Sequence, residues 1–451
     1  MAQANSAASE RNVFFGVMKN VAQLFLGQAM AGVLGLLFTI LMARSLTPSE
    51  FGQVTLLYAW PRLMATLGSG RSWQVILHYG AAPLENGEKS PVQRAISFAL
   101  GLDFFTLILA TLVAVTGVVF FSQTVGVSAS LLGMGIVASL LTIPATCLNS
   151  STTGILRLFG RMGLVAKQEP YTAIIRLLLG LLVWQFSGGI VGFALAIGIA
   201  TMSGQLYVIL AAFRILKENY FTFSPAFHLV RLSQEMPQGV WRLMFSANLG
   251  YCLNAAVNPA VFMIVGRFFG PAAVAFFGLA ETFLRAIAKL GRLLEESYYP
   301  DLARLDIRSS KPWSLVGRIE LIALGASVLT ILITCFAGSF IFALLGNNYL
   351  EALPLMQWMS PSLLFLMLGL PLEGLLYCAG KSISILWVQV ISALSMFVFI
   401  AVFMSTPSFL TFGLGLSYSL AAMVKFLFYL AGIGTIFSSK EKIVPLHERQ
   451  R

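Results

Sequence analysis

Long apolar segments recur from one end of the chain to the other, and they restrict its fold more than any other feature. Of the 451 residues, 58% are hydrophobic and only 10% are charged, and the mean hydropathy is +0.84. A helix needs about 20 mostly apolar residues to cross a hydrocarbon layer of about 30 Å, and many segments reach that length. A single water-soluble core could not enclose so much apolar surface, so the sequence predicts a membrane-embedded protein.

The apolar segments predict helices rather than the strands of a barrel. Barrel strands alternate apolar and polar residues over about ten positions, whereas stretches such as LLGMGIVASLLTIPATCLNS are continuously apolar. We therefore expect an all-α polytopic fold of about twelve transmembrane helices. The predicted spans are 21–42, 53–77, 95–121, 126–148, 164–186, 189–213, 240–264, 274–298, 316–345, 352–378, 382–404 and 409–436.

The distribution of Lys and Arg predicts the orientation of these helices. Cationic residues collect in cytoplasmic loops, and here alternate connections differ sharply in charge. The basic set holds both termini and Lys89, Arg94, Arg157, Arg161, Lys167, Arg214, Lys217, Arg231, Arg304, Arg308, Lys311 and Lys381. The opposite set, at residues 43–52, 122–125, 187–188, 265–273, 346–351 and 405–408, holds only Arg44 and Arg267. We expect a multi-pass protein of the bacterial inner membrane with both termini in the cytoplasm.

An offset of 223 residues aligns the chain with itself. The matches that carry the most weight are Gly16 with Gly239, Gly27 with Gly250, Arg44 with Arg267, Pro48 with Pro271, Arg62 with Arg285 and Gly68 with Gly291. A repeat of six helices enters the membrane twice in the same direction, which predicts two six-helix bundles related by a pseudo-twofold axis along the membrane normal. The expected parts are an N-terminal segment 1–20, bundles 21–213 and 240–436, a cytoplasmic linker 214–239 and a tail 437–451.

The second helix has a clear start signal. Thr47 suits an N-cap, Pro48 suits the first helical position, and Glu50 can complete a capping box with Thr47.

The chain resembles the bacterial polysaccharide-biosynthesis flippases, which include the Wzx-type O-antigen translocases, in its N-terminal basic segment, its first helix ending FTILMARSLTPSEFGQVTLL and its charged second helix. Their superfamily also contains multidrug and toxin extrusion antiporters and lipid II flippases. The resemblance implies two bundles around a cavity that opens alternately to each side of the membrane. Its expected cargo is an undecaprenyl-diphosphate-linked oligosaccharide, moved to the periplasmic leaflet for lipopolysaccharide or related surface polysaccharide.

Intramembrane cations are the candidate substrate-binding residues. An Arg at mid-membrane costs about 2.5 to 3.5 kcal/mol on insertion scales, so it usually faces a bundle interior or a wet cavity. Arg62 and its repeat partner Arg285 match the cavity cations of the resembled family. Guanidinium groups can offer paired donors to a diphosphate. Further candidates are Lys289, Arg176 and Lys425. The alternative is a structural role, in which neutralised polar stripes pack helices together.

Four other polar residues are candidates for the cavity lining. Glu281 shares one helical face with Arg285, Lys289 and Arg292, at spacings of four, four and three. Tyr251, Asn254 and Asn258 lie at spacings of three and four on the seventh helix. Asn could bind sugar hydroxyls, but hydrogen bonding between helices is the commoner use.

Catalytic and metal-binding patterns are missing from the sequence. Cys147, Cys252, Cys335 and Cys378 have no metal-ligand spacing, and the three His residues are scattered. We expect a transporter without a cofactor rather than an enzyme, and coupling to protons or sodium is left open. The expected partners are the lipid-linked oligosaccharide and membrane lipids, together with polysaccharide polymerases and glycosyltransferases, but no nucleic acid.

Two other functions remain to be weighed. A multidrug or cation antiporter of the same superfamily would typically use membrane carboxylates, but residues 21–42 contain no Asp or Glu. A membrane polysaccharide polymerase or ligase would generally carry a large periplasmic loop, and the expected periplasmic loops are all short.

Overall fold

The computed structural model describes residues 26–122, 127–225, 229, 240–304, 310–379, 381–406 and 408–438. Within these ranges the structure is almost entirely helical and has no β-strand. The expected N-terminal segment 1–20 and most of the predicted linker and tail lie outside the described residues.

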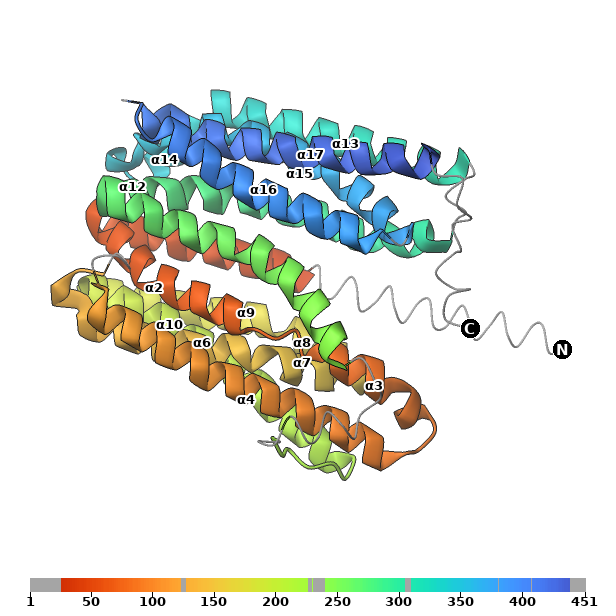
Figure 1. Ribbon diagram of the computed structural model, residues 1–451. Helices are drawn as coiled ribbons and strands as arrows, with labels where there is room; N and C mark the ends of the chain where they lie inside the picture. The colour runs from red at the N-terminus through yellow and green to blue at the C-terminus, as the bar shows by residue number, and fades with distance from the viewer. Residues whose placement is uncertain are drawn as a thin grey trace. The chain divides into compact units, whose positions relative to one another are not determined.

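Contacts divide the chain into two units, which Figure 1 colours from red to blue along the chain. The first unit contains residues up to Leu46 and Gln53–Arg267, and the second contains Thr47–Gly52 and residues from Phe268 onward. By this division the segment 240–267, predicted to begin the second bundle, groups with the first unit. The bundle limits themselves stay a prediction.

The first unit is built from long apolar helices joined by tight turns. Its elements are a helix Leu26–Ser45, α2 (Pro48–Gly68, whose first turn belongs to the second unit), α3 (Trp73–Glu85), α4 (Lys89–Phe120), η1 (Ala129–Leu131), α6 (Leu132–Cys147), α7 (Asn149–Leu158), α8 (Met162–Ala166), α9 (Gln168–Gln185), α10 (Gly189–Glu218) and the first part of α12 (Val240–Arg304). α4, α6 and α10 pack side by side, and α9 packs along α10. A core formed by α3, α4, α7 and α10 is almost wholly aliphatic around Ile96, Leu100 and Val208.

The second unit contains the rest of α12 and the later helices. These are α13 (Ser310–Phe336), α14 (Gly338–Leu345), η2 (Asn347–Tyr349), α15 (Ala352–Cys378), α16 (Ser382–Phe403), η3 (Phe409–Gly413) and α17 (Leu414–Ser438). α15 packs against α13 and α17, and α17 packs against α16, so these helices lie side by side in Figure 1. Leu375, Leu376 and Tyr429 form the centre of one of their cores.

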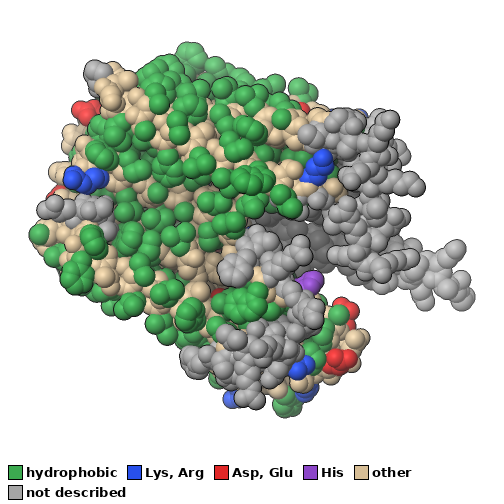
Figure 2. Space-filling model, in the orientation of Figure 1, with side chains coloured by type: hydrophobic (Ala, Val, Ile, Leu, Met, Phe, Trp, Pro, Cys, Tyr) green, Lys and Arg blue, Asp and Glu red, His purple; other side chains and the backbone are tan. Residues whose placement is uncertain are grey.

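Large apolar side chains remain on the outside of the helices. Phe120 is 75% exposed, Leu321 70% and Phe336 83%. Hydrophobic side chains cover most of the face drawn in Figure 2, and the charged ones lie mainly near its ends. Nine of the described helices are long and apolar enough to cross a membrane, so these exposed side chains suit contact with lipid tails.

Each of the twelve predicted spans falls mainly on helix, with two corrections. The span 53–77 is not one helix, because α2 ends at Gly68 and α3 begins at Trp73. The loop expected at 265–273 shrinks to one non-helical residue, Gly270, inside α12. Its φ of 83° is accessible to Gly without steric cost. One residue therefore interrupts the helix, where the sequence predicted a loop of nine residues.

The predicted capping box at the start of α2 is confirmed. The backbone N–H of Thr47 donates to Glu50 Oε2 at 2.8 Å, and the backbone N–H of Glu50 donates to Thr47 Oγ1 at 3.4 Å. Within the second unit this first turn meets the bend of α12. A Cβ on Gly52 would lie 1.7 Å from the carbonyl oxygen of Pro271, so only a glycine permits the approach.

We predict that Gly52→Ala destabilises the protein by at least about 2 kcal/mol, because backbone must move to admit the methyl group. Thermal unfolding in detergent, with size-exclusion profiles of the same sample, measures the effect. Gly133→Ala in α6 is the matched control, since a Cβ there meets nothing within 4 Å. Equal melting temperatures for the two variants would show that the contact is loose.

Candidate functional site

Two of the predicted cavity cations, Arg62 and Arg176, come together in the first unit. α2 presents Tyr58 and Arg62 on one face, one turn apart, and the Arg62 Cζ lies 5.7 Å from the centre of the Tyr58 ring. The Tyr58 hydroxyl donates to the Ala194 carbonyl of α10 at 2.5 Å. This hydrogen bond fixes the Tyr58 ring, and the ring positions the Arg62 guanidinium. The Arg62 side chain remains exposed.

Arg176 approaches the same place from α9. Its Nη2 donates to Thr201 Oγ1 of α10 at 3.4 Å, while its buried Nε has no hydrogen-bond partner among the described residues. Arg176 interacts electrostatically with Arg62, which repels it, and with Tyr58 and Glu169. Two cations on α2 and α9 therefore interact with one another, and Arg176 retains a buried donor that no described residue uses. We refer to Tyr58, Arg62, Arg176 and Thr201 as the arginine pair site.

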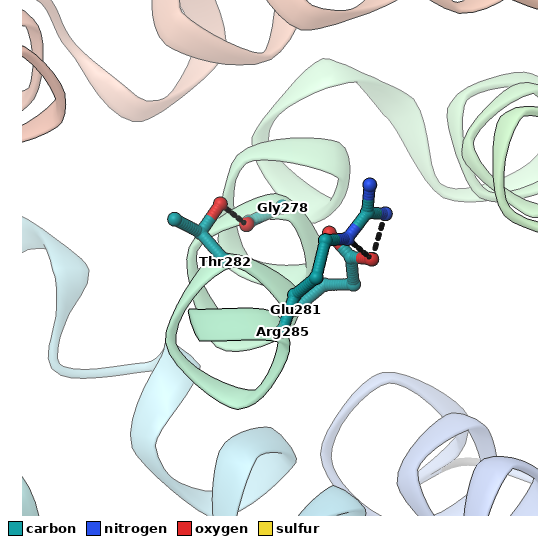
Figure 3. Close-up of polar contacts among 4 residues, drawn as sticks. All are labelled: Gly278, Glu281, Thr282 and Arg285. Atoms are coloured by element: carbon teal, nitrogen blue, oxygen red, sulfur yellow. Dashed lines mark hydrogen bonds and ion pairs between the residues drawn. The ribbon is translucent and has the colours of Figure 1, made fainter. Parts of the chain in front are cut away.

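The repeat partner Arg285 has a different neighbour. Glu281, one turn earlier in α12, forms an ion pair with Arg285, as Figure 3 shows. The Glu281 side chain is largely buried, whereas that of Arg285 is 52% exposed. Thr282 Oγ1 donates to the Gly278 carbonyl at 2.7 Å and so turns back onto its own helix. The 223-residue offset aligns Glu281 with Tyr58 in the sequence. The equivalent position therefore carries a phenol in the first half and a carboxylate in the second.

The remaining candidate cations of the second unit lie on two helices. Lys289 lies on α12 one turn beyond Arg285 and is partly buried. Lys425 of α17 lies 5.6 Å from the ring centre of Tyr429, whose hydroxyl donates to Glu373 Oε2 of α15 at 2.7 Å. Lys425 thus borders the α15–α17 packing core. The side chain of Arg292 lies outside the described residues.

Of the polar positions predicted on the seventh helix, which is the first part of α12, Tyr251 meets the α2–α3 junction. Tyr251 lies with its ring centre 4.9 Å from Arg71 Cζ. Asn254 is exposed and Asn258 is partly buried. Asn248, which the sequence did not single out, donates from Nδ2 to the Gly70 carbonyl at 2.9 Å.

Sequence reasoning missed the residues of this junction. Arg71 and Arg157 both lie beside the Trp73 ring. The sequence places Arg71 inside the predicted span 53–77 and Arg157 in a cytoplasmic loop, so neither is a predicted site residue. The run Gly68, Ser69, Gly70 could have signalled the break, since two glycines so close together disfavour helix.

Asp103 of α4 holds the junction together. Its side chain is fully buried, and Oδ2 accepts from Ser72 Oγ at 2.9 Å and from the Ser151 backbone N–H at 2.9 Å. Ser151 lies in the first turn of α7, where backbone N–H groups lack helical partners and favour an anion. Asp103 therefore satisfies backbone and side-chain donors at a point where two helices are interrupted.

Metal ligation has no visible basis in this part of the chain. Within the described ranges, no three His, Cys, Asp or Glu side chains gather in a group that could hold a metal ion.

We predict that Asp103→Ala lowers the free energy of unfolding by about 1 to 3 kcal/mol, because it leaves the Ser72 hydroxyl and Ser151 N–H buried without an acceptor. Asp103→Asn retains one acceptor oxygen and should fall between Ala and wild type. Thermal unfolding in detergent is the measurement, with exposed Glu351→Ala as control. Wild-type stability in Asp103→Ala would refute the anchoring role.

Comparison with known proteins identifies the fold. No family model matches the chain. The inner membrane protein YghQ of Escherichia coli (strain K12) is 28% identical over 342 residues, which covers 75% of this chain and 95% of that protein.

Solved structures give the architecture. The lipid II flippase MurJ in an inward closed conformation has a TM-score of 0.72 at 13% identity and covers 91% of this chain and 87% of its own. An inward-facing multidrug resistance MATE family transporter of the MOP superfamily has a TM-score of 0.68 at 14% identity and covers 92% and 96%. A MOP superfamily transporter from Pyrococcus furiosus has a TM-score of 0.60 at 14% identity and covers 93% and 97%. The predicted all-α polytopic fold of twelve helices in two bundles is confirmed, and it is the fold of the MOP superfamily transporters.

Proposed function

We propose that the protein is a flippase that moves an undecaprenyl-diphosphate-linked oligosaccharide across the bacterial inner membrane by alternating access, for cell-surface polysaccharide synthesis. The observation that carries the proposal is the arginine pair site. Arg62 and Arg176 are two cations on membrane helices that interact with one another, and among the described residues Glu169 is the carboxylate that acts on Arg176.

An anionic substrate would resolve the energetics of this site. Charge repulsion is weakly screened within apolar surroundings, so two neighbouring guanidinium groups disfavour the empty site. A diphosphate brings negative charge and several acceptor oxygens, and guanidinium binds such groups through paired, charge-assisted hydrogen bonds. The Arg176 Nε is a buried donor still to be satisfied. The diphosphate would supply the negative charge and the acceptor oxygen that the described residues do not provide to Arg176 Nε.

Comparison with other proteins supports this class of substrate. MurJ, which shares the fold, is named as a lipid II flippase. For the Pyrococcus furiosus transporter, reverse polarity of the binding pocket suggests a different function. We apply the same logic and infer the substrate from charge: a cationic site selects an anion.

A multidrug or cation antiporter is the alternative that the MATE neighbours favour. Two observations count against it. The first helix, Leu26–Ser45, contains no Asp or Glu, and Oδ2 of the buried carboxylate Asp103 accepts hydrogen bonds from Ser72 and Ser151 in a structural role. The arginine pair site would also repel a cationic drug. A polysaccharide polymerase or ligase has less support, since the neighbours are named as transporters and flippases.

Several finer expectations belong to the same proposal. They are cytoplasmic termini, O-antigen or related lipopolysaccharide glycans, and functional association with polymerases and glycosyltransferases. Coupling to protons or sodium stays open.

We predict that replacing Arg62 and Arg176 together by Gln lowers the rate of flipping by at least about tenfold, because the diphosphate loses charge-assisted hydrogen bonds worth about 1.5 to 3 kcal/mol each. The measurement uses purified protein in liposomes and a fluorescent undecaprenyl-diphosphate oligosaccharide in the inner or outer leaflet.

Arg214→Gln is the matched control, because it removes one cation from an exposed ion pair with Glu218. Arg285→Gln should have a smaller effect than the double variant, since Glu281 already neutralises Arg285. Full flipping activity in the double variant, with normal folding by size exclusion, would refute the site. Export of cationic dyes by the wild type would favour the antiporter instead.

A further inference from the structure

A second group of cations and aromatic rings lies at the α2–α3 junction and is made of other residues than the arginine pair site. Arg157 Cζ lies 4.9 Å from the ring centre of Trp73, and Arg71 Cζ lies 5.7 Å from the same ring. Arg71 Cζ is also 4.9 Å from the Tyr251 ring. We call these four residues the junction cluster: Arg71, Trp73, Arg157 and Tyr251.

The backbone holds the cluster in a defined geometry. Trp73 donates its backbone N–H to Ser150 Oγ at 3.2 Å. A Cβ on Gly154 of α7 would lie 2.7 Å from the Trp73 Cα, so α3 and α7 are in close contact. Arg71 has a φ of 40°, which is uncommon for a residue with a side chain. Such backbone outliers gather at ligand-binding positions, and this one directs Arg71 between two rings.

The Arg71 guanidinium has hydrogen-bonding capacity to spare. It makes no hydrogen bond or ion pair with any residue that the structure describes, although it carries five N–H donors. Ring contacts use the face of a guanidinium and leave its in-plane N–H groups available. The aromatic neighbours therefore orient the Arg71 guanidinium without accepting hydrogen bonds from its N–H groups.

The cluster is also accessible to a ligand. Tyr251 is 39% exposed, and Arg71, Trp73 and Arg157 are partly exposed. A strongly hydrated phosphate could reach them without displacing a packed core.

We propose that the junction cluster is a second substrate station, which binds the diphosphate of the lipid-linked oligosaccharide before it reaches the arginine pair site. The inference rests on the proposed function and deepens it. Arg71 is the main ligand, Arg157 adds positive charge, and the rings of Trp73 and Tyr251 fix the guanidinium groups. The cargo is a diphosphate attached to a lipid, not free phosphate.

The position of the cluster suits a station for capture. The 21 residues of α2 advance about 30 Å, close to the thickness of the hydrocarbon layer. Arg62 lies within that length, whereas Arg71 follows its end. In the predicted orientation α2 runs from the periplasmic to the cytoplasmic side, so the cluster would meet the substrate on the side where flipping starts.

The test is binding to protein in lipid nanodiscs, with three probes: farnesyl-diphosphate-linked N-acetylglucosamine, farnesol and inorganic pyrophosphate. We expect Arg71→Gln to weaken binding of the lipid-linked diphosphate about tenfold, a change of about 1.4 kcal/mol, and to leave the weak binding of farnesol unchanged. Pyrophosphate should bind the wild type more weakly than the lipid-linked probe.

Flipping assays separate the two stations. Arg71→Gln should raise the substrate concentration needed for half-maximal flipping by about tenfold with little change in the maximal rate, in proportion to the lost affinity. Tyr251→Phe, which keeps the ring, should behave as wild type, and Tyr251→Leu should resemble a milder Arg71→Gln.

Arg161→Gln is the control, because Arg161 is an exposed cation just after α7. Unchanged affinity in a folded Arg71→Gln protein that still flips substrate would overturn the station and leave the proposed function standing. Tighter binding of pyrophosphate than of the lipid-linked probe would overturn the choice of ligand. Failure of the wild type to bind or flip any lipid-linked diphosphate would overturn both proposals.

Discussion

The need to satisfy every backbone polar group away from water governs this structure. Helices meet that need internally, and a helix interrupted inside a membrane protein must find other partners. The α2–α3 junction shows how the chain does so. Asn248 donates to the Gly70 carbonyl, and Asp103 accepts from Ser72 and from the first turn of α7. A break that hydropathy could not reveal is thereby held by three other helices.

Charged side chains on the membrane helices also need partners, and those that lack partners among the described residues indicate function. Glu281 neutralises Arg285, and Lys425 lies beside a tyrosine that is itself bonded to Glu373. Arg176 and Arg71 differ, since each retains donors that the described residues do not use. A charged group is costly to leave in that state. We therefore expect an anion at these two places, where the described residues leave guanidinium donors unused.

The predicted internal repeat aligns two arginines, Arg62 and Arg285, whose neighbours differ. Tyr58 orients Arg62 through its ring and leaves its charge intact, whereas Glu281 at the equivalent position pairs with Arg285. One substitution thus divides the roles of two related helices. The same offset relates Pro48 to Pro271, yet the first begins α2 after a capping box and the second follows a glycine bend within α12.

By itself the sequence determined the membrane class, the approximate positions of the helical spans and the capping box at Thr47, because apolar length and local capping chemistry are properties of neighbouring residues. It also singled out Arg62 and Arg176, because inserting a cationic side chain into the membrane costs free energy whichever way that side chain faces. Only the tertiary structure decided that these two meet, that Arg285 is neutralised, and that Arg71 and Arg157 share one indole ring. Each of those outcomes depends on which helix faces meet across the fold, and contact between distant segments leaves no periodic trace in a single sequence.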